Sequence, residues 1–339
     1  MPLPISSRRE LGDDFTICSL PVGLWQLAGG HGPIDRETAI ESLFDYLDAG
    51  YTTLDMADHY GPAEEIYGEF RRRLGQRRGE QALAGIQAMT KWCPSAGEMT
   101  REVVEAAVEV SLGRMDVECL DVLQFHWWDY DDPRYLDALS HMADLQHEGR
   151  IGHLALTNFD SVHLARIAEA GIRVVSNQVQ YSLVDRRPER EQLAVCREHD
   201  IRFLTYGTLC GGLISEQYLG SDEPTPADLE TNSKTKYKRM IDAWGGWDLF
   251  QRLLRGLADV AARHEVGMAN VATRAILERE RVAGVIVGCR LGLSEHRTDN
   301  ARVFDFSLDE ADWEVLDEAV DGHQDLLSSI GDCGDEYRG

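Results

Sequence analysis

The chain has few positive charges. Its 34 lysines and arginines stand against 59 aspartates and glutamates, which gives a formal net charge of −25. An anionic polymer or lipid surface would be repelled by such a protein, so nucleic acid and membrane are excluded as main partners. The sequence also lacks an apolar run long enough to cross a bilayer, and its first residues contain no apolar signal region. These absences predict a soluble, cytoplasmic protein.

Paired cysteines are missing as well. The seven cysteines are scattered singly, without a C-x-x-C pair. A zinc or redox dithiol site is therefore not expected, and no metal is predicted. Free thiols of this kind fit a reducing cytoplasmic compartment.

A unit of strand, loop and helix recurs along most of the chain. Polar residues at intervals of 20 to 36 positions follow the expected strands, at Asp55, Lys91, His126, Asn158, Gln178 and Tyr206. One βαβ unit needs about 30 residues or more, so eight such strands predict a parallel α/β sheet. No G-x-G-x-x-G follows the first strand, which favours a closed (β/α)8 TIM barrel over a doubly wound sheet.

We expect a single barrel domain over residues 1–339, with an N-terminal segment 1–20 and a frayed C-terminal tail 321–339. A strand is predicted over residues 23–29, followed by a helix capped by Asp35. Further helices are predicted over residues 99–112, 135–146, 190–199, 247–264 and 270–279, and an extra C-terminal helix over 309–320. The 82 positions between Tyr206 and Gly288 begin with a polar segment, which predicts an extended, functional loop after strand 7.

Four ionisable residues, which we call the tetrad, converge on one mouth of this barrel: Asp55, Tyr60, Lys91 and His126. The pKa of tyrosine is about 10, so it needs a nearby cation to release its proton easily, and Lys91 could supply one. Asp55 would hold the ammonium, and His126 could orient a substrate oxygen. Each residue alone could be structural, as a buried ion pair, a packing tyrosine or a core histidine. Their joint placement predicts protonation of a carbonyl oxygen.

The motifs around the tetrad, L-D-M-A-D-H-Y-G, T-K-W-C and L-Q-F-H-W-W-D, resemble those of the aldo-keto reductases. The resemblance extends from residue 23 to about 320. It implies a (β/α)8 barrel that binds an extended nicotinamide cofactor without a Rossmann fold. It also implies that Tyr60 is the general acid/base, that Lys91 and Asp55 tune it, and that His126 orients the substrate.

The same resemblance implies where the cofactor binds. Thr157, in place of the family's serine, would hold the nicotinamide carboxamide with Asn158 and Gln178, and Tyr206 would stack on the ring. The pyrophosphate would contact Gly207, Thr208, Leu209, Gly211, Gly212 and Leu213. The adenosine end would contact Arg290, His296, Asp299 and Asn300. Further expected contacts are Gly23, Leu24, Trp25, Asp55 and Gly288.

The choice between NADP and NAD depends on the adenosine end. Arg290 would face the 2′-phosphate, whereas His296 stands where many members have an arginine, and Arg297 follows it. Two cations in an otherwise acidic chain favour NADP, with NAD as the alternative.

Aromatic residues are expected to shape the substrate site: Trp25, His59, Trp92 and Trp127, with Trp128 as a further candidate. Walls with few fixed charges suit a neutral or weakly polar aldehyde, ketone or sugar better than a dianion. Adjacent strand residues point to opposite faces, so Trp127 or Trp128 should instead pack behind the barrel.

The function predicted from the sequence is hydride transfer between nicotinamide and a carbonyl carbon by an NAD(P)-dependent oxidoreductase. A small carbonyl or alcohol substrate is then the expected partner. Two alternatives stay open: a regulatory, cofactor-binding subunit of the same fold, and an NAD-dependent aldose dehydrogenase working in the oxidative direction. The sequence does not indicate the oligomeric state.

Overall fold

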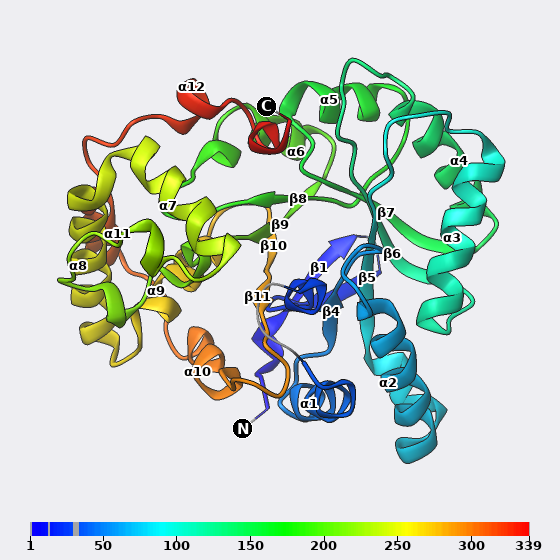
Figure 1. Cartoon of the computed structure of the whole chain (residues 1–339), viewed down its shortest axis with the longest axis horizontal. Coiled ribbons are helices and arrows are strands. Elements are labelled where there is room, and N and C mark those ends of the chain that lie inside the picture. The colour runs from blue at the N-terminus through cyan, green and yellow to red at the C-terminus, as the bar shows by residue number, and fades with distance from the viewer. Residues whose placement is uncertain (1, 13, 30–33, 339) are drawn as a thin grey trace.

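The computed structural model describes residues 2–12, 14–29 and 34–338, which form a barrel of parallel strands surrounded by helices (Figure 1). The barrel strands follow the order β10-β9-β8-β7-β6-β5-β4-β3-β11. Their bounds are β3 (Val22–Gly23), β4 (Thr53–Asp55), β5 (Gln87–Trp92), β6 (Leu120–Phe125), β7 (Ile151–Thr157), β8 (Ser176–Gln180), β9 (Arg202–Tyr206), β10 (Val282–Val285) and β11 (Val287–Gly288). The predicted fold class is confirmed.

The barrel closes through its last strand. The strand expected near Gly288 is divided at Ile286, so that β10 pairs with β9 and β11 pairs with β3. The N–H of Val287 also donates to the carbonyl oxygen of Pro21, at 3.0 Å. Both edges of the sheet are therefore hydrogen-bonded, which removes open strand edges.

Helices cover the outside of the barrel. Their bounds are α1 (Arg36–Asp48), α2 (Ala63–Arg78), α3 (Arg101–Met115), α4 (Tyr135–His147), α5 (Ser161–Glu169), α6 (Glu191–Glu198), α7 (Asn232–Trp244), α8 (Gly246–His264), α9 (Met268–Leu277), α10 (Arg297–Ala301), α11 (Glu310–Ala319) and α12 (Leu326–Ile330). Asp35 caps α1 as predicted, because its carboxylate accepts from the N–H of Thr38. The predicted strand 23–29 was wrong: β3 ends at Gly23, and a 3-10 helix follows over Trp25–Ala28. No helix of the described residues is long and apolar enough to cross a membrane.

Alternation along the strands sorts apolar and polar side chains into layers. The lower interior is filled by Met89, Val122, Ala155 and Leu204. Two positions farther along the same four strands stand Lys91, Gln124, Thr157 and Tyr206. Because side chains repeat every second residue in a strand, these polar groups lie above the apolar plug, at the carboxyl ends.

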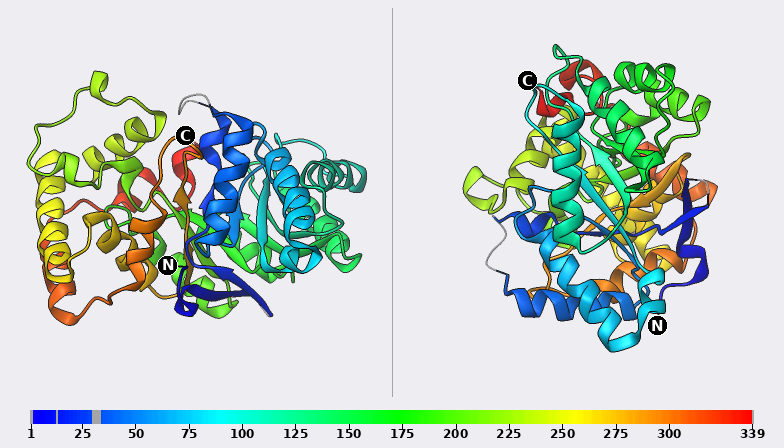
Figure 2. Two further views of the ribbon diagram at one scale, coloured as in Figure 1. Left: turned by 90° about the horizontal axis from the view of Figure 1, so that it is seen from below. Right: turned by 90° about the vertical axis from the view of Figure 1, so that its right-hand side faces the viewer.

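Two segments outside the repeat cover opposite ends of the barrel (Figure 2). The antiparallel hairpin of β1 (Arg8–Gly12) and β2 (Phe15–Cys18) places Leu11 and Ile17 in the lower interior cluster. The C-terminal tail lies at the other end, where it forms α12 and a 3-10 turn over Asp335–Tyr337. Its Cys333 is buried. The expectation of a frayed tail was therefore wrong.

Candidate active site

A buried ion pair lies at the centre of the barrel mouth. The Nζ of Lys91 donates to Asp55 Oδ2 at 2.6 Å and to the carbonyl oxygen of Met56 at 3.0 Å. The other carboxylate oxygen of Asp55 accepts from the amides of Gln124 and Gln178, at 2.8 and 2.9 Å. A buried ion pair is stable only when its remaining hydrogen-bonding capacity is used, and here three neighbouring groups use it.

Tyr60 lies beside this pair, in the loop after β4. Gly61 adopts φ +55°, and a Cβ there would approach the carbonyl oxygen of Leu27 to 2.7 Å, so glycine is required where the loop turns toward α2. The Nζ of Lys91 lies 5.1 Å from the centre of the Tyr60 ring. Tyr60 thus meets two of the other tetrad members, as the sequence predicted.

The electrostatic effect on Tyr60 differs from the expected one. Burial, followed by the negative charge of Asp55, raises the pKa of Tyr60 well above 10. The protons of Lys91 are directed at Asp55 and Met56 instead of the phenol. Tyr60 therefore carries its proton at neutral pH.

His126, directly after β6, completes the tetrad. Its ring stacks on Trp128 with centroids 4.0 Å apart. Burial, with smaller electrostatic contributions from Arg338, His59 and Lys91, lowers the pKa of His126 to about 3, so the imidazole is neutral. Among the described residues, its buried Nε2 has no hydrogen-bond partner. Buried polar atoms rarely stay unpaired, so this nitrogen is suited to a substrate oxygen.

The residues expected to hold the nicotinamide adjoin the tetrad, and they lie on β7, β8 and β9 or directly after β7. The hydroxyl of Thr157 is buried without a partner in the described part of the chain. Asn158 has φ +58°, and its Oδ1 accepts from the hydroxyl of Tyr206 at 2.7 Å. Gln178 directs its amide nitrogen at Asp55 and Gln124. An unpaired hydroxyl beside two carboxamides fits the amide of a nicotinamide.

The loop after β9 fits a phosphate cradle. Gly207, Gly211 and Gly212 have φ of +73°, +66° and +93°, and a Cβ on Gly212 would meet nothing within 4 Å. The hydroxyl of Thr208 donates inward to the carbonyl oxygen of Tyr181, and Leu213 is buried. Leu209 also packs against the neighbouring apolar cluster. The backbone is thus open at Gly212, where a phosphate would meet backbone groups, whereas the Tyr237 ring packs over Gly207 and Gly211.

The start of the barrel offers fewer side-chain contacts than expected. Leu24 is fully buried, and its N–H donates to the backbone oxygen of Asp55 at 2.9 Å. A Cβ on Gly23 would lie 2.7 Å from Ile286, whereas Trp25 is 37% exposed. Trp25 is the member of this group whose side chain can reach a ligand.

The residues expected at the adenosine end lie on the surface near β11 and α10. Arg290, His296 and Asp299 are exposed, and Asn300 is partly exposed; Gly288 ends β11. Arg297 pairs with Asp45 and Glu295, each at 2.9 Å. The second cation considered from the sequence is thus neutralised by two carboxylates.

The tryptophans lie on two different sides of the barrel wall, as the alternation of side chains along a strand requires. Trp92 and Trp127 are 8% and 0% exposed and pack against Phe125 on the outer side of the sheet. The indole N–H of Trp127 donates to the carbonyl oxygens of Asp129 and Asp132. Placing these two tryptophans in the substrate site was wrong, because each directly follows or precedes a residue that faces the mouth. Trp128, 39% exposed, lines the mouth instead.

His59 lies at the edge of the mouth, with its ring edge-on to Tyr60 at 4.9 Å. Asp58 accepts from the His59 ring at 2.8 Å and from the N–H of Cys93 at 3.1 Å. The side-chain atoms of Asp58, His59 and Cys93 that could bind a metal ion lie within 4.8 Å of one another. Sequence spacing does not reveal this grouping. The carboxylate of Asp58 thereby ties the Tyr60 loop to the end of β5.

Three residues that the sequence did not indicate adjoin the mouth. The hydroxyl of Tyr337 accepts hydrogen bonds from Tyr206, at 3.2 Å, and from Lys236. Arg338 donates to the carbonyl oxygens of Trp127 and Asn158, at 2.8 and 2.7 Å. For the two tail residues, the signals in the sequence are the aromatic side chain of Tyr337 and the charge of Arg338.

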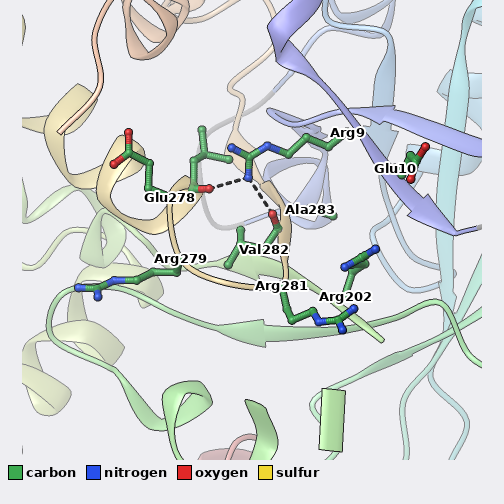
Figure 3. Close-up of a pocket in the computed structure, with 9 residues that line it drawn as sticks. Arg9, Glu10, Arg202, Glu278, Arg279, Arg281, Val282 and Ala283 are labelled. Atoms are coloured by element: carbon green, nitrogen blue, oxygen red, sulfur yellow. Dashed lines mark hydrogen bonds between the residues drawn. The ribbon is translucent and has the colours of Figure 1, made fainter. Parts of the chain in front are cut away.

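A separate cavity of about 710 Å³ lies at the amino ends of β9 and β10, opposite the tetrad (Figure 3). It is lined by Arg9, Glu10, Arg202, Leu277, Glu278, Arg279, Arg281, Val282 and Ala283. Arg9 donates to the carbonyl oxygens of Leu277 and Val282, at 2.5 and 2.8 Å. No tetrad or expected cofactor residue lines this cavity.

The chain matches the family model described as the aldo/keto reductase family over residues 19–321. It is 22% identical to the NADH-specific methylglyoxal reductase of Escherichia coli, over 91% of this chain and 96% of that protein. It is 29% identical to the aldo-keto reductase YhdN of Bacillus subtilis, over 66% of this chain and 69% of that one.

Solved structures agree on the fold. A glycerol dehydrogenase of Gluconobacter oxydans superposes with a TM-score of 0.76 at 21% identity, over 97% of this chain and 98% of that chain. A thermostable aldo-keto reductase bound to the inhibitor epalrestat gives 0.71 at 24% identity, over 92% and 99%. With the family model spanning the whole barrel, this chain belongs to the aldo/keto reductase family and is an oxidoreductase of that family.

Proposed function

We propose that this protein reduces the carbonyl group of a small aldehyde, ketone or sugar, with Tyr60 as the proton donor. The observation that carries the proposal is the grouping of the partly buried Tyr60 with the buried residues Asp55, Lys91 and His126, in which Tyr60 keeps its proton and His126 is neutral. The related Escherichia coli proteins named as methylglyoxal and L-glyceraldehyde 3-phosphate reductases support small aldehydes as substrates.

Each residue has a defined part in this proposal. The Nε2 of His126 hydrogen-bonds the carbonyl oxygen and orients the substrate, while Tyr60 donates its proton to that oxygen. Lys91 compensates the negative charge that remains on the phenolate, and Asp55 keeps the ammonium in place. A bound nicotinamide supplies the hydride, and Thr157, Asn158, Gln178 and Tyr206 would hold it.

The test is Tyr60→Phe, assayed with methylglyoxal and DL-glyceraldehyde. The variant should bind the reduced cofactor normally, as measured by fluorescence, and lose turnover by about 10²–10⁴-fold, the usual contribution of a general acid. Tyr67→Phe, which removes a buried phenol of α2, is the matched control and should keep its turnover. Equal turnover in wild type and Tyr60→Phe would rule out the mechanism.

The same assay separates the alternatives. Tight cofactor binding by wild type without reduction of any carbonyl would favour a regulatory subunit. Faster oxidation of aldoses with NAD than reduction of aldehydes would favour the dehydrogenase.

For the cofactor we propose NADP, read through Arg290. A guanidinium suits a phosphate that NAD lacks, so Arg290→Ala should weaken NADPH binding about tenfold and leave NADH binding unchanged. Arg297→Ala is the control, because Arg297 is already paired with Asp45 and Glu295. An unchanged ratio of the two affinities in Arg290→Ala would refute the assignment.

A further inference from the structure

Lys236 reaches the mouth from α7, the helix that follows the polar loop after β9. The adjacent Tyr237 packs over the glycine loop, where a Cβ on Gly207 or Gly211 would collide with its ring. The Nζ of Lys236 lies 5.4, 5.3 and 4.1 Å from the ring centres of Tyr206, Tyr237 and Tyr337. Three aromatic faces thus surround the ammonium, a setting that favours a cation.

The charge of Lys236 lacks the partners that its helix neighbours have. Lys234 pairs with Glu230, and Lys238 pairs with Glu223 and Asp242. Within the described part of the chain, no carboxylate lies within 4.0 Å of Lys236, its hydrogen bond goes to the hydroxyl of Tyr337, and Glu336 acts on the ammonium only at longer range.

The carboxylate nearest in sequence to Tyr337 is already engaged. Glu336 pairs with the buried Arg187 at 3.0 Å, and Arg187 in turn pairs with Asp185 at 2.8 Å. This ion-pair cluster anchors the tail and fixes Tyr337 beside the mouth. An ammonium has three donors, so Lys236 keeps hydrogen-bonding capacity for a ligand.

Lys236 lies one tyrosine ring away from the imidazole that would hold the carbonyl. The rings of Tyr337 and His126 are edge-on with centroids 6.3 Å apart, and the hydroxyl of Tyr337 reaches Lys236. The separation suits a substituent a few bonds from the reacting carbon. Arg338, the next residue of the tail, adds a second cation and lowers the pKa of His126.

We propose that Lys236 binds an anionic substituent of the substrate, a carboxylate or a phosphate, and that Tyr337 holds the ammonium in position. This specificity rests on the carbonyl reduction proposed above. It differs from the expectation of a neutral or weakly polar substrate, which depended on aromatic walls with few fixed charges. A lysine is well suited to the task because its compact charge binds phosphate or carboxylate without a fixed fork geometry.

The test compares Lys236→Met with Lys234→Met, a control two positions away in the same helix. Two substrate pairs differ in charge: glyceraldehyde 3-phosphate against glyceraldehyde, and 4-carboxybenzaldehyde against 4-nitrobenzaldehyde. Lys236→Met should raise KM for the charged member about 10- to 100-fold, with KM for the neutral member within about twofold. Lys234→Met should change neither, and Tyr337→Phe should raise only the KM for the charged members, by a smaller factor.

A KM increase confined to one charged substrate would support the proposal and identify the anion as phosphate or carboxylate. Equal effects on charged and neutral substrates would overturn it. So would weaker cofactor binding in Lys236→Met that accounts for the whole change, because the lysine would then serve the pyrophosphate.

A binding measurement keeps this inference separate from the proposed reaction. Calorimetry of glycerol 3-phosphate with the cofactor-saturated protein needs no turnover. Binding that depends on Lys236, in a protein that reduces no aldehyde, would refute the reaction and keep the anion site. Aldehyde reduction with equal glycerol 3-phosphate affinity in wild type and Lys236→Met would do the reverse.

Discussion

The two ends of the barrel differ in how far their polar groups are satisfied. At the carboxyl ends, the Nε2 of His126 and the hydroxyl of Thr157 are buried without partners in the described chain. At the amino ends, Arg9 donates to two backbone carbonyls, and Arg202 and Arg281 share Asp200, although Nε and one terminal nitrogen of Arg279 are buried without a hydrogen-bond partner among the described residues. Yet the 710 Å³ cavity is at the amino ends (Figure 3). The reactive end is therefore indicated by unpaired atoms that lie beside the ionisable tetrad, whereas cavity size and charge alone would point to the amino ends.

The contrast between the two ends of the barrel is present within a single strand. β9 begins at Arg202 and ends at Tyr206, so one strand contributes to both ends. Parallel strands direct all their carboxyl ends the same way, and the loops that follow bring Tyr60, Lys236 and the glycine cradle to that end. The hairpin of β1 and β2 lies at the other end, where Leu11 packs against the barrel interior.

Among substitutions at the two ends of the barrel, Lys91→Met should have the largest effect on stability and on turnover. It leaves Asp55 charged and buried without its ammonium, and breaking such a pair costs about 3–5 kcal/mol of unfolding free energy. Turnover should also fall at least about 100-fold, because the phenolate of Tyr60 loses its compensating charge. Urea unfolding and steady-state kinetics measure the two effects.

The double variant Lys91→Met/Asp55→Asn is the matched control. Removing both charges should restore most of the stability without restoring turnover. If Lys91→Met unfolds at the wild-type urea concentration, the ion pair does not have the structural role assigned to it.

A smaller effect is expected from the titration of His126. Its pKa is lowered to about 3 in the folded state, so below about 6.5 the unfolded chain binds the proton that the folded chain refuses. Stability should therefore fall as the pH drops, by up to about 1.4 kcal/mol per pH unit. Between pH 7 and pH 5, wild type should lose about 2 kcal/mol more than His126→Gln, measured by urea unfolding. Equal losses in both proteins would show that the imidazole titrates normally.

The features that could be predicted from the sequence depend on local period. Strand and helix patterns gave the barrel, and polar residues at strand ends gave Asp55, Lys91 and His126 at one mouth. The assignment of Trp92 and Trp127 failed although the same period could have corrected it, since each is adjacent to a residue that faces inward. The aromatic character of these two residues favours a substrate wall, whereas their position in the strand indicates packing behind the sheet.

The remaining features depend on contacts between distant segments. The tail is held by Arg187, which pairs with Glu336 149 positions later. Lys236 reaches Tyr337 across 101 positions. The raised pKa of Tyr60 likewise depends on burial and on the negative charge of Asp55, and the extent of neither follows from residue spacing.

Arg281→Gln should give the smallest effect and tests the amino end directly. Arg281 pairs with the exposed Asp200, and an exposed pair contributes about 0–1 kcal/mol, so unfolding free energy should change by no more than that. Turnover and cofactor affinity should stay within about twofold, because Arg281 already pairs with Asp200 and lies at the end of the barrel opposite the tetrad. A tenfold loss of turnover, with stability unchanged, would mean that the arginine-lined cavity is coupled to the tetrad through the strands. The contrast between a reactive end and a structural end would then fail.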